Sequence, residues 1–132
     1  MKLNSSDLDQ CLQLFKEDGY FILPKFFERA EIVGLQERID QIMLGTADVD
    51  YDQIWMQLDT DSGNYEDLGW GGNGFQGATL DYRKIQGLEA DQCFLDFITS
   101  SFFVQLCERV YGPNLPITSF RTMFMNKAAG KG

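Results

Sequence analysis

Histidine is absent from the 132 residues of this chain. The absence removes the commonest metal ligand in proteins and the usual acid–base side chain near neutral pH. Long apolar runs are also missing, since none approaches the ~18 residues that span a bilayer. The N-terminus lacks the apolar segment of a secretory signal. We therefore expect no membrane partner and no histidine-based catalytic or metal site in these residues.

Cysteine is scarce, and none of the three cysteines pairs as C-x-x-C. An odd count without a secretory signal is typical of reduced thiols in a cytoplasmic protein. Cys11, Cys93 and Cys107 could in principle gather around zinc. Because each lies in an apolar helical pattern, we expect small buried side chains instead.

Basic residues are missing between Arg38 and Arg83, and this gap accounts for the whole net charge of −9. The acidic residues in the gap are Asp40, Asp48, Asp50, Asp52, Asp59, Asp61, Glu66, Asp67 and Asp81. A surface of this sign repels phosphate backbones. We therefore expect no nucleic-acid partner.

Apolar residues are plentiful, with a hydrophobic content of 44%, which suffices for one core in a single domain over residues 1–132. Apolar spacing predicts helices that begin near Ser5 or Ser6 and end at Gly19, and over residues 28–44, 91–99 and 101–111. Short apolar runs predict extended segments at residues 20–23, 80–88 and 117–127. Together these elements predict an α+β fold with helices on one side of a sheet.

Residues 46–79 read as an acidic, glycine-rich excursion with one helical turn near residues 53–58. Residues 72–77 match G-x-G-x-x-G, but no strand precedes them and no helix follows, so a flexible loop is favoured over a dinucleotide site. The acidic runs at 48–52 and 59–63 begin like calcium loops and lack the glycine and glutamate that such loops need. A solvated acidic loop explains them better than a cation site.

Alternation in the segment around Lys84 places Tyr82, Lys84 and Gln86 on one side and Arg83 and Ile85 on the other. Lys84 is then either a solvated lysine on an edge strand or a lysine that faces an anionic ligand.

The last extended segment divides in the same way. Phe120 and Phe124 fall on a face that would pack against helices. The other face carries Ser119, Arg121, Met123 and Met125. One arginine beside two methionines is typical of neither solvent nor core, so this face is either a cavity wall or an ordinary half-buried surface.

Three stretches together carry a resemblance to a known family. Residues 15–24 read FKEDGYFILP, residues 82–87 read YRKIQG, and residues 110–114 (VYGPN) are followed by 123–127 (MFMNK). In this order and spacing they resemble the phytanoyl-CoA dioxygenase-like family of Fe(II)/2-oxoglutarate oxygenases. The resemblance spans nearly the whole chain except residues 46–79.

The resemblance implies a double-stranded β-helix, a jelly-roll or cupin-like fold, of which this chain holds the N-terminal helices and first strands. Family members bind iron through a His-x-Asp motif and a distal histidine, with open coordination positions. None of these residues occurs here, so we assign no catalytic residue and no metal ligand. Lys84 matches a lysine that contacts 2-oxoglutarate in some members of the family, and Met123 matches a strand residue lining the cofactor pocket. Ser119, Arg121 and Met125 are possible cavity neighbours by alternation alone.

Two functional hypotheses follow. In the first, the chain is the N-terminal part of a dioxygenase that hydroxylates a small organic substrate, with Fe(II) and 2-oxoglutarate as cofactors of the intact enzyme. We expect this chain alone to be inactive and to bind neither cofactor well, because it stops before the His-x-Asp motif. The excursion at 46–79 would then form a lid or a substrate wall. In the second, the chain is a non-enzymatic acidic interaction module that self-associates through unfinished sheet edges.

Overall fold

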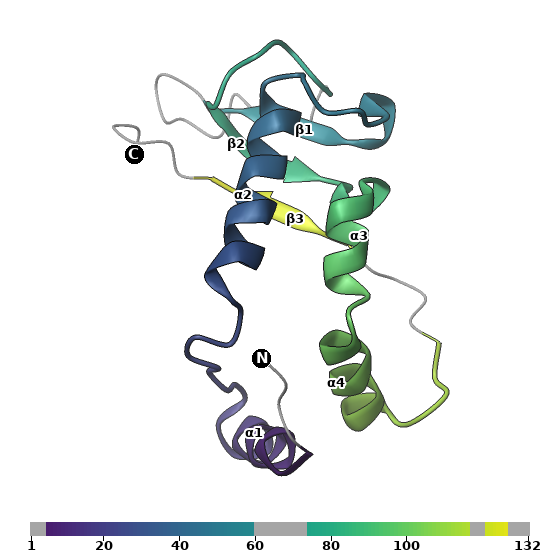
Figure 1. Ribbon diagram of the computed structural model, residues 1–132. Helices are drawn as coiled ribbons and strands as arrows, with labels where there is room; N and C mark the ends of the chain where they lie inside the picture. The colour runs from purple at the N-terminus through teal and green to yellow at the C-terminus, as the bar shows by residue number, and fades with distance from the viewer. Residues whose placement is uncertain (1–4, 60–73, 117–120, 127–132) are drawn as a thin grey trace.

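A computed structural model describes residues 5–59, 74–116 and 121–126 (Figure 1). Its helices are α1 (Ser5–Asp18), α2 (Arg29–Met43), α3 (Gln92–Ile98) and α4 (Ser101–Tyr111), with short 3-10 turns η1 (Tyr51–Gln53) and η3 (Leu88–Ala90). Its strands are β1 (Trp55–Leu58), β2 (Tyr82–Gln86) and β3 (Met123–Met125). The strands form an open antiparallel sheet in the order β1-β2-β3. The predicted α+β class is confirmed.

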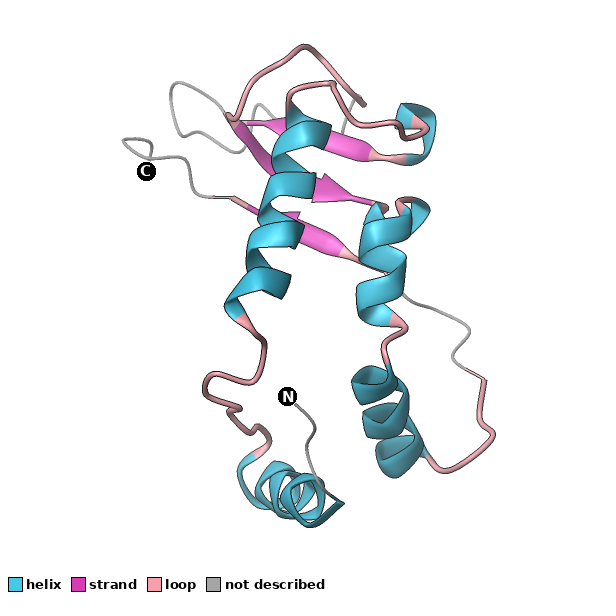
Figure 2. Ribbon diagram, viewed as in Figure 1, coloured by secondary structure: helices cyan, strands magenta, loops and turns pink. Residues whose placement is uncertain are grey.

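Helix α2 crosses one face of the sheet, and α3 lies beside it (Figure 2). Helices α1 and α4 lie beyond the sheet, at the opposite end of the molecule (Figure 1). The apolar stripe of α2 meets the inward side chains of β1 and β2. The resulting core consists of Ile39, Ile42, Met43, Ala47, Ile54, Met56, Tyr82, Ile85, Leu88 and Phe94.

A second apolar cluster, made of aromatic rings, lies between the segment before α2 and the α3–α4 junction. It comprises Phe26, Phe27, Phe97, Phe102 and Phe103, with ring centroids 4.3–6.5 Å apart. Tilted and edge-to-face pairs at these separations are favourable. This cluster therefore joins the helical end of the molecule to the start of α2.

The helix boundaries agree with the sequence-based expectation. Helix α1 ends before Gly19, whose φ of 80° is left-handed. At the start of α2 the backbone N–H of Glu28 donates to the Glu31 carboxylate at 2.8 Å. Gly45, at φ 72°, follows the end of α2, and an added Cβ there would lie 2.6 Å from the Phe75 ring. Helices α3 and α4 fill the two segments predicted after β2.

The strand predicted at residues 20–23 is wrong. These residues form no strand, and the side chains of Tyr20 and Ile22 are 63% and 74% exposed. Phe21 instead packs edge-on against Phe15 of α1. An extended segment needs a neighbouring strand for its backbone hydrogen bonds, and no strand of the described residues pairs with it.

The helical turn predicted near residues 53–58 is also wrong. The turn η1 comes earlier, and the residues after it form β1, so the excursion at 46–79 is not wholly irregular. Ile54 and Met56 are buried, whereas Trp55 between them is exposed. This alternation of buried and exposed side chains is typical of a strand. Residues 60–73 of the excursion lie outside the described residues.

The last strand is shorter than predicted, because only Met123–Met125 pair with β2. Just before this strand, the backbone N–H of Thr122 donates a hydrogen bond to the Glu89 carboxylate at 3.0 Å and not to a neighbouring strand. Residues 117–120 and 127, with the expected Phe120 and Ser119, lie outside the described residues. Phe124 packs against the core as predicted.

Candidate functional site

The face of the sheet opposite α2 carries two rows of paired side chains. Since Met56, Ile85 and Phe124 point toward the helix side, their neighbours point away from it. One row pairs Gln57, Lys84 and Met125, and the next pairs Trp55, Gln86 and Met123. We call these six residues the open face, because Trp55, Met123 and Met125 are 54%, 45% and 64% exposed.

A β-bulge at Arg83 sets which residues of β2 belong to the open face. Lys84 pairs with Gln57 and Tyr82 with Leu58, which leaves Arg83 as an extra residue between them. Tyr82 is fully buried on the helix side. The expected alternation is therefore wrong for Tyr82 and Arg83 and right for Lys84, Ile85 and Gln86.

Three cationic side chains belong to or contact the open face. Arg83 donates from Nη2 to Oε1 of Gln57 at 2.8 Å, which places it next to Lys84. Arg121 donates from Nη1 to Oε1 of Gln86 at 3.2 Å. This gathering stands out in a chain of net charge −9. The ammonium of Lys84 is half-buried and has no hydrogen-bond or ion-pair partner among the described residues. Such a group suits an anionic ligand.

The structure therefore brings four of the predicted site residues to one surface. Lys84, Arg121, Met123 and Met125 share it, whereas Ser119 lies outside the described residues. Sequence reasoning missed Trp55 and Gln57 as members of the same surface. The alternation of Ile54, Met56 and Leu58 with these two residues was the signal that could have found them.

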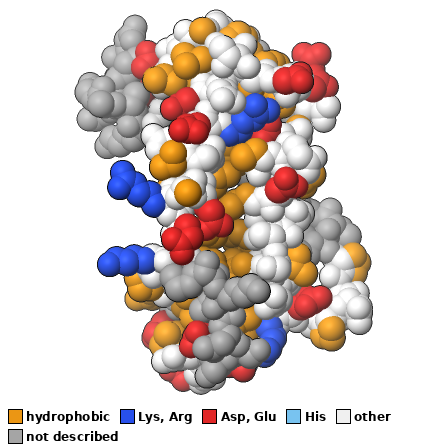
Figure 3. Space-filling model, viewed as in Figure 1, with side chains coloured by type: hydrophobic (Ala, Val, Ile, Leu, Met, Phe, Trp, Pro, Cys, Tyr) orange, Lys and Arg blue, Asp and Glu red, His pale blue; other side chains and the backbone are white. Residues whose placement is uncertain are grey.

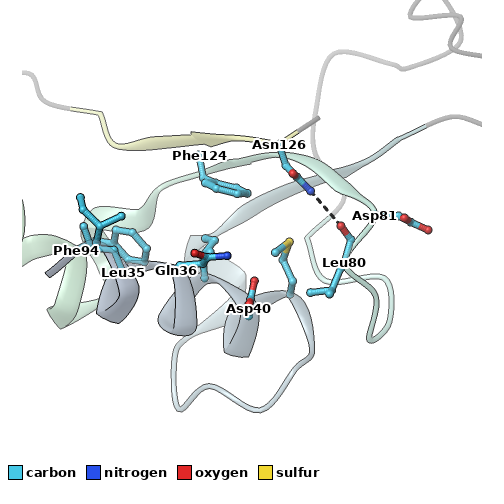
Figure 4. A pocket seen from close by; sticks show the side chains of 11 residues that line it. Leu35, Gln36, Asp40, Leu80, Asp81, Phe94, Phe124 and Asn126 are labelled. Atoms are coloured by element: carbon cyan, nitrogen blue, oxygen red, sulfur yellow. Dashed lines mark hydrogen bonds between the residues drawn. The ribbon is translucent and has the colours of Figure 1, made fainter. Parts of the chain in front are cut away.

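A cavity of about 670 Å³ lies on the other side of the sheet, between α2 and the strands (Figure 4). Its apolar lining consists of Ile32, Leu35, Ile39, Met43, Leu80, Phe94 and Phe124. Its polar lining consists of Gln36, Asp40, Asp81 and Asn126. The side-chain amide of Asn126 donates to the carbonyl of Leu80 at 3.1 Å, which holds β3 against the segment that precedes β2.

The buried carboxylate of Asp91 precedes α3, the helix that supplies Phe94 to the cavity wall. Its Oδ2 accepts from Nε and Nη2 of Arg38 at 2.9 and 2.6 Å, which joins α2 to the start of α3. Its Oδ1 caps α3 by accepting from the backbone N–H groups of Cys93 and Phe94. The hydrogen bond to Asp91 raises the pKa of Arg38, and burial raises the pKa of the Cys93 thiol.

Metal and membrane features can be assessed for the described part of the chain. There, no three or more cysteine and carboxylate side chains come together to hold a metal ion. Among the described helices, none combines the length and the apolar character of a membrane span.

Comparisons with protein-family models, with curated proteins and with solved structures find no match to this chain.

Proposed function

We propose that this chain forms the N-terminal helices and first strands of an Fe(II)/2-oxoglutarate oxygenase with a double-stranded β-helix. In this proposal the open face is one wall of the cavity that receives 2-oxoglutarate. The observation that carries it is the position of Lys84, which lies between Gln57 and Met125 on the sheet face opposite α2. The antiparallel sheet with helices on one side is compatible with the start of such a fold.

The open face fits the organic co-substrate. The Lys84 ammonium supplies a donor and a positive charge for a carboxylate, and Arg83 and Arg121 add positive potential nearby. The thioethers of Met123 and Met125 offer apolar contacts that would keep water from the carbon chain of the ligand. A dicarboxylate such as 2-oxoglutarate matches this combination of cations and apolar surface.

Iron does not fit the residues of this chain. Histidine is absent from the sequence, and the described residues contain no group of three metal-binding side chains. The open face itself offers amides, thioethers and cations, and the cations repel a metal ion. In the proposed enzyme the iron ligands come from other residues, so we derive no chemical step at the metal from this chain.

The test is turnover by the full product of the gene that encodes these residues. The protein is loaded with Fe(II) without oxygen and is then given 2-oxoglutarate and oxygen, and succinate is measured. Lys84→Ala should raise the KM for 2-oxoglutarate about ten- to a hundredfold, the range expected for one charged hydrogen bond. Lys84→Arg should restore part of the affinity, and Lys16→Ala, an exposed lysine of α1, should change nothing. A reading frame without iron ligands and without succinate formation would refute the proposal.

A second candidate function is a non-enzymatic interaction module. Within the described residues, β3 pairs with β2 on one side only, so its other edge is open. An open edge beside the exposed side chains of Met123, Met125 and Trp55 is a surface onto which a further strand can add. Under this function the protein self-associates, and sedimentation at increasing concentration should show a dimer. A monomer at the highest concentration would exclude self-association.

A further inference from the structure

The cavity beneath α2 is separate from the open face. Along β3, Phe124 points into the cavity (Figure 4). Its strand neighbours Met123 and Met125 point to the opposite side of the sheet. The cavity's volume of about 670 Å³ and its mostly apolar lining are typical of sites for small organic molecules. The proposed oxygenase function makes no use of it.

One carboxylate in the cavity wall, that of Asp40, is not paired within the described part of the chain. Asp40 is half-buried in its wall, and its carboxylate has no hydrogen-bond or ion-pair partner among the described residues. Figure 4 shows Gln36 and Asp40 on successive turns of α2, with their polar ends beneath the sheet. The lining contains no lysine or arginine, and it includes the second acidic residue Asp81.

The basic residue nearest to Asp40 in the sequence already has other partners. Arg38, two positions before Asp40, is held by the carboxylate of Asp91 and by the side chain of Gln41. Figure 3 shows hydrophobic side chains between α2 and α3, with acidic side chains on either side of them. A ligand cation that reaches a half-buried carboxylate beside apolar surface replaces the water lost when the ligand covers it.

We infer that this cavity binds a small organic amine, with an apolar body and a protonated amino group. The ammonium pairs with the Asp40 carboxylate and donates to the side-chain carbonyl of Gln36. The apolar body lies against Ile39, Phe94 and Phe124, where it removes hydrophobic surface from water. A neutral ligand would leave Asp40 without a partner, and an anionic ligand would be repelled by it.

The test compares three probes of equal chain length on the 132-residue protein, namely n-octylamine, 1-octanol and octanoate, each below its micelle concentration. Binding is measured by calorimetry, and the site is located by amide chemical shifts. We expect n-octylamine to bind at least about tenfold more tightly than 1-octanol, as one charged hydrogen bond allows. Octanoate should bind more weakly than either.

Asp40→Asn keeps the shape of the side chain and removes its charge, so it should abolish the preference for the amine and leave 1-octanol binding unchanged. Glu37→Gln is the matched control, because Glu37 is an exposed acid of α2 outside the cavity. Glu37→Gln should keep the preference for n-octylamine over 1-octanol, and circular dichroism checks that both variants are folded. Lys84→Ala should also keep this preference, so the result is independent of the oxygenase proposal.

Equal binding of n-octylamine and 1-octanol to the native protein would overturn the inference, as would a preference that survives Asp40→Asn. Amide shifts of the cavity residues that change on simple dilution would also overturn it, because a second copy of the chain would then occupy the cavity.

Discussion

Replacing Asp91 with alanine should destabilise the protein more than alanine at any other charged residue among those the structure describes. Asp91 is 2% exposed, and one carboxylate performs two tasks. It accepts two hydrogen bonds from Arg38 and caps the first turn of α3. Alanine removes both at once.

The magnitude follows from the two tasks. Loss of the helix cap costs about 1 kcal/mol. Loss of the charged hydrogen bonds to a fully buried arginine would cost about 3 kcal/mol or more, but Arg38 is 24% exposed and regains water. We therefore take about 2 kcal/mol for the pair. The sum of about 3 kcal/mol corresponds to a fall in melting temperature of about 10 °C for a domain of this size.

The assay is urea unfolding followed by circular dichroism, together with Asp91→Asn and Arg38→Met. Asparagine retains the cap and loses the charge, so Asp91→Asn should cost less than Asp91→Ala. The double variant Arg38→Met with Asp91→Asn should show a coupling energy of at least about 1 kcal/mol. Glu108→Ala, at an exposed position of α4, is the control. A loss below about 1 kcal/mol for Asp91→Ala would refute the reasoning.

Three further predictions concern backbone strain, a buried hydroxyl and a thiol. Gly87→Ala should lower the urea midpoint by the equivalent of about 2–3 kcal/mol, because φ is 80° and the new Cβ would lie 2.5 Å from the carbonyl oxygen of Gln53. An unchanged midpoint would contradict this. Tyr82→Phe should cost about 1–3 kcal/mol in thermal unfolding, since the buried hydroxyl accepts one backbone hydrogen bond at 2.6 Å and donates another at 2.9 Å. A melting temperature equal to that of the native protein would count against these bonds. Burial raises the pKa of Cys93, so its thiolate is scarcer in the folded state and iodoacetamide should label it more slowly than in the urea-unfolded chain at mildly alkaline pH. Equal rates in the two states would show that the folded state does not protect this thiol.

The helices could be predicted because local signals agree along each segment. Helix α2 combines an apolar stripe with a capping pair at Glu28 and Glu31 and with a left-handed glycine after its end. The strands depended on partners that local patterns do not reveal. Residues 20–23 are as apolar as a strand but have no partner strand among the described residues, whereas β1, inside an acidic excursion, pairs with β2.

The candidate site could be predicted from local sequence patterns only in part. Lys84, Met123 and Met125 fall on one face because alternation needs no knowledge of the partner strand. The bulge at Arg83 depends on the register between β1 and β2, which the sequence does not state. The cavity could not be foreseen, since its lining joins α2, α3, β3 and the segment before β2 across the whole chain.

The bulge at Arg83 also has an evolutionary consequence. In a regular strand, gaining or losing one residue turns every following side chain to the wrong face. Here Arg83 is already the surplus residue, so a chain lacking its codon would keep Tyr82 and Ile85 toward the helix and Lys84 away from it. The strand can therefore gain or lose one positive charge by a single in-frame insertion or deletion without repacking its core. We expect gaps in alignments of related sequences to fall at this position.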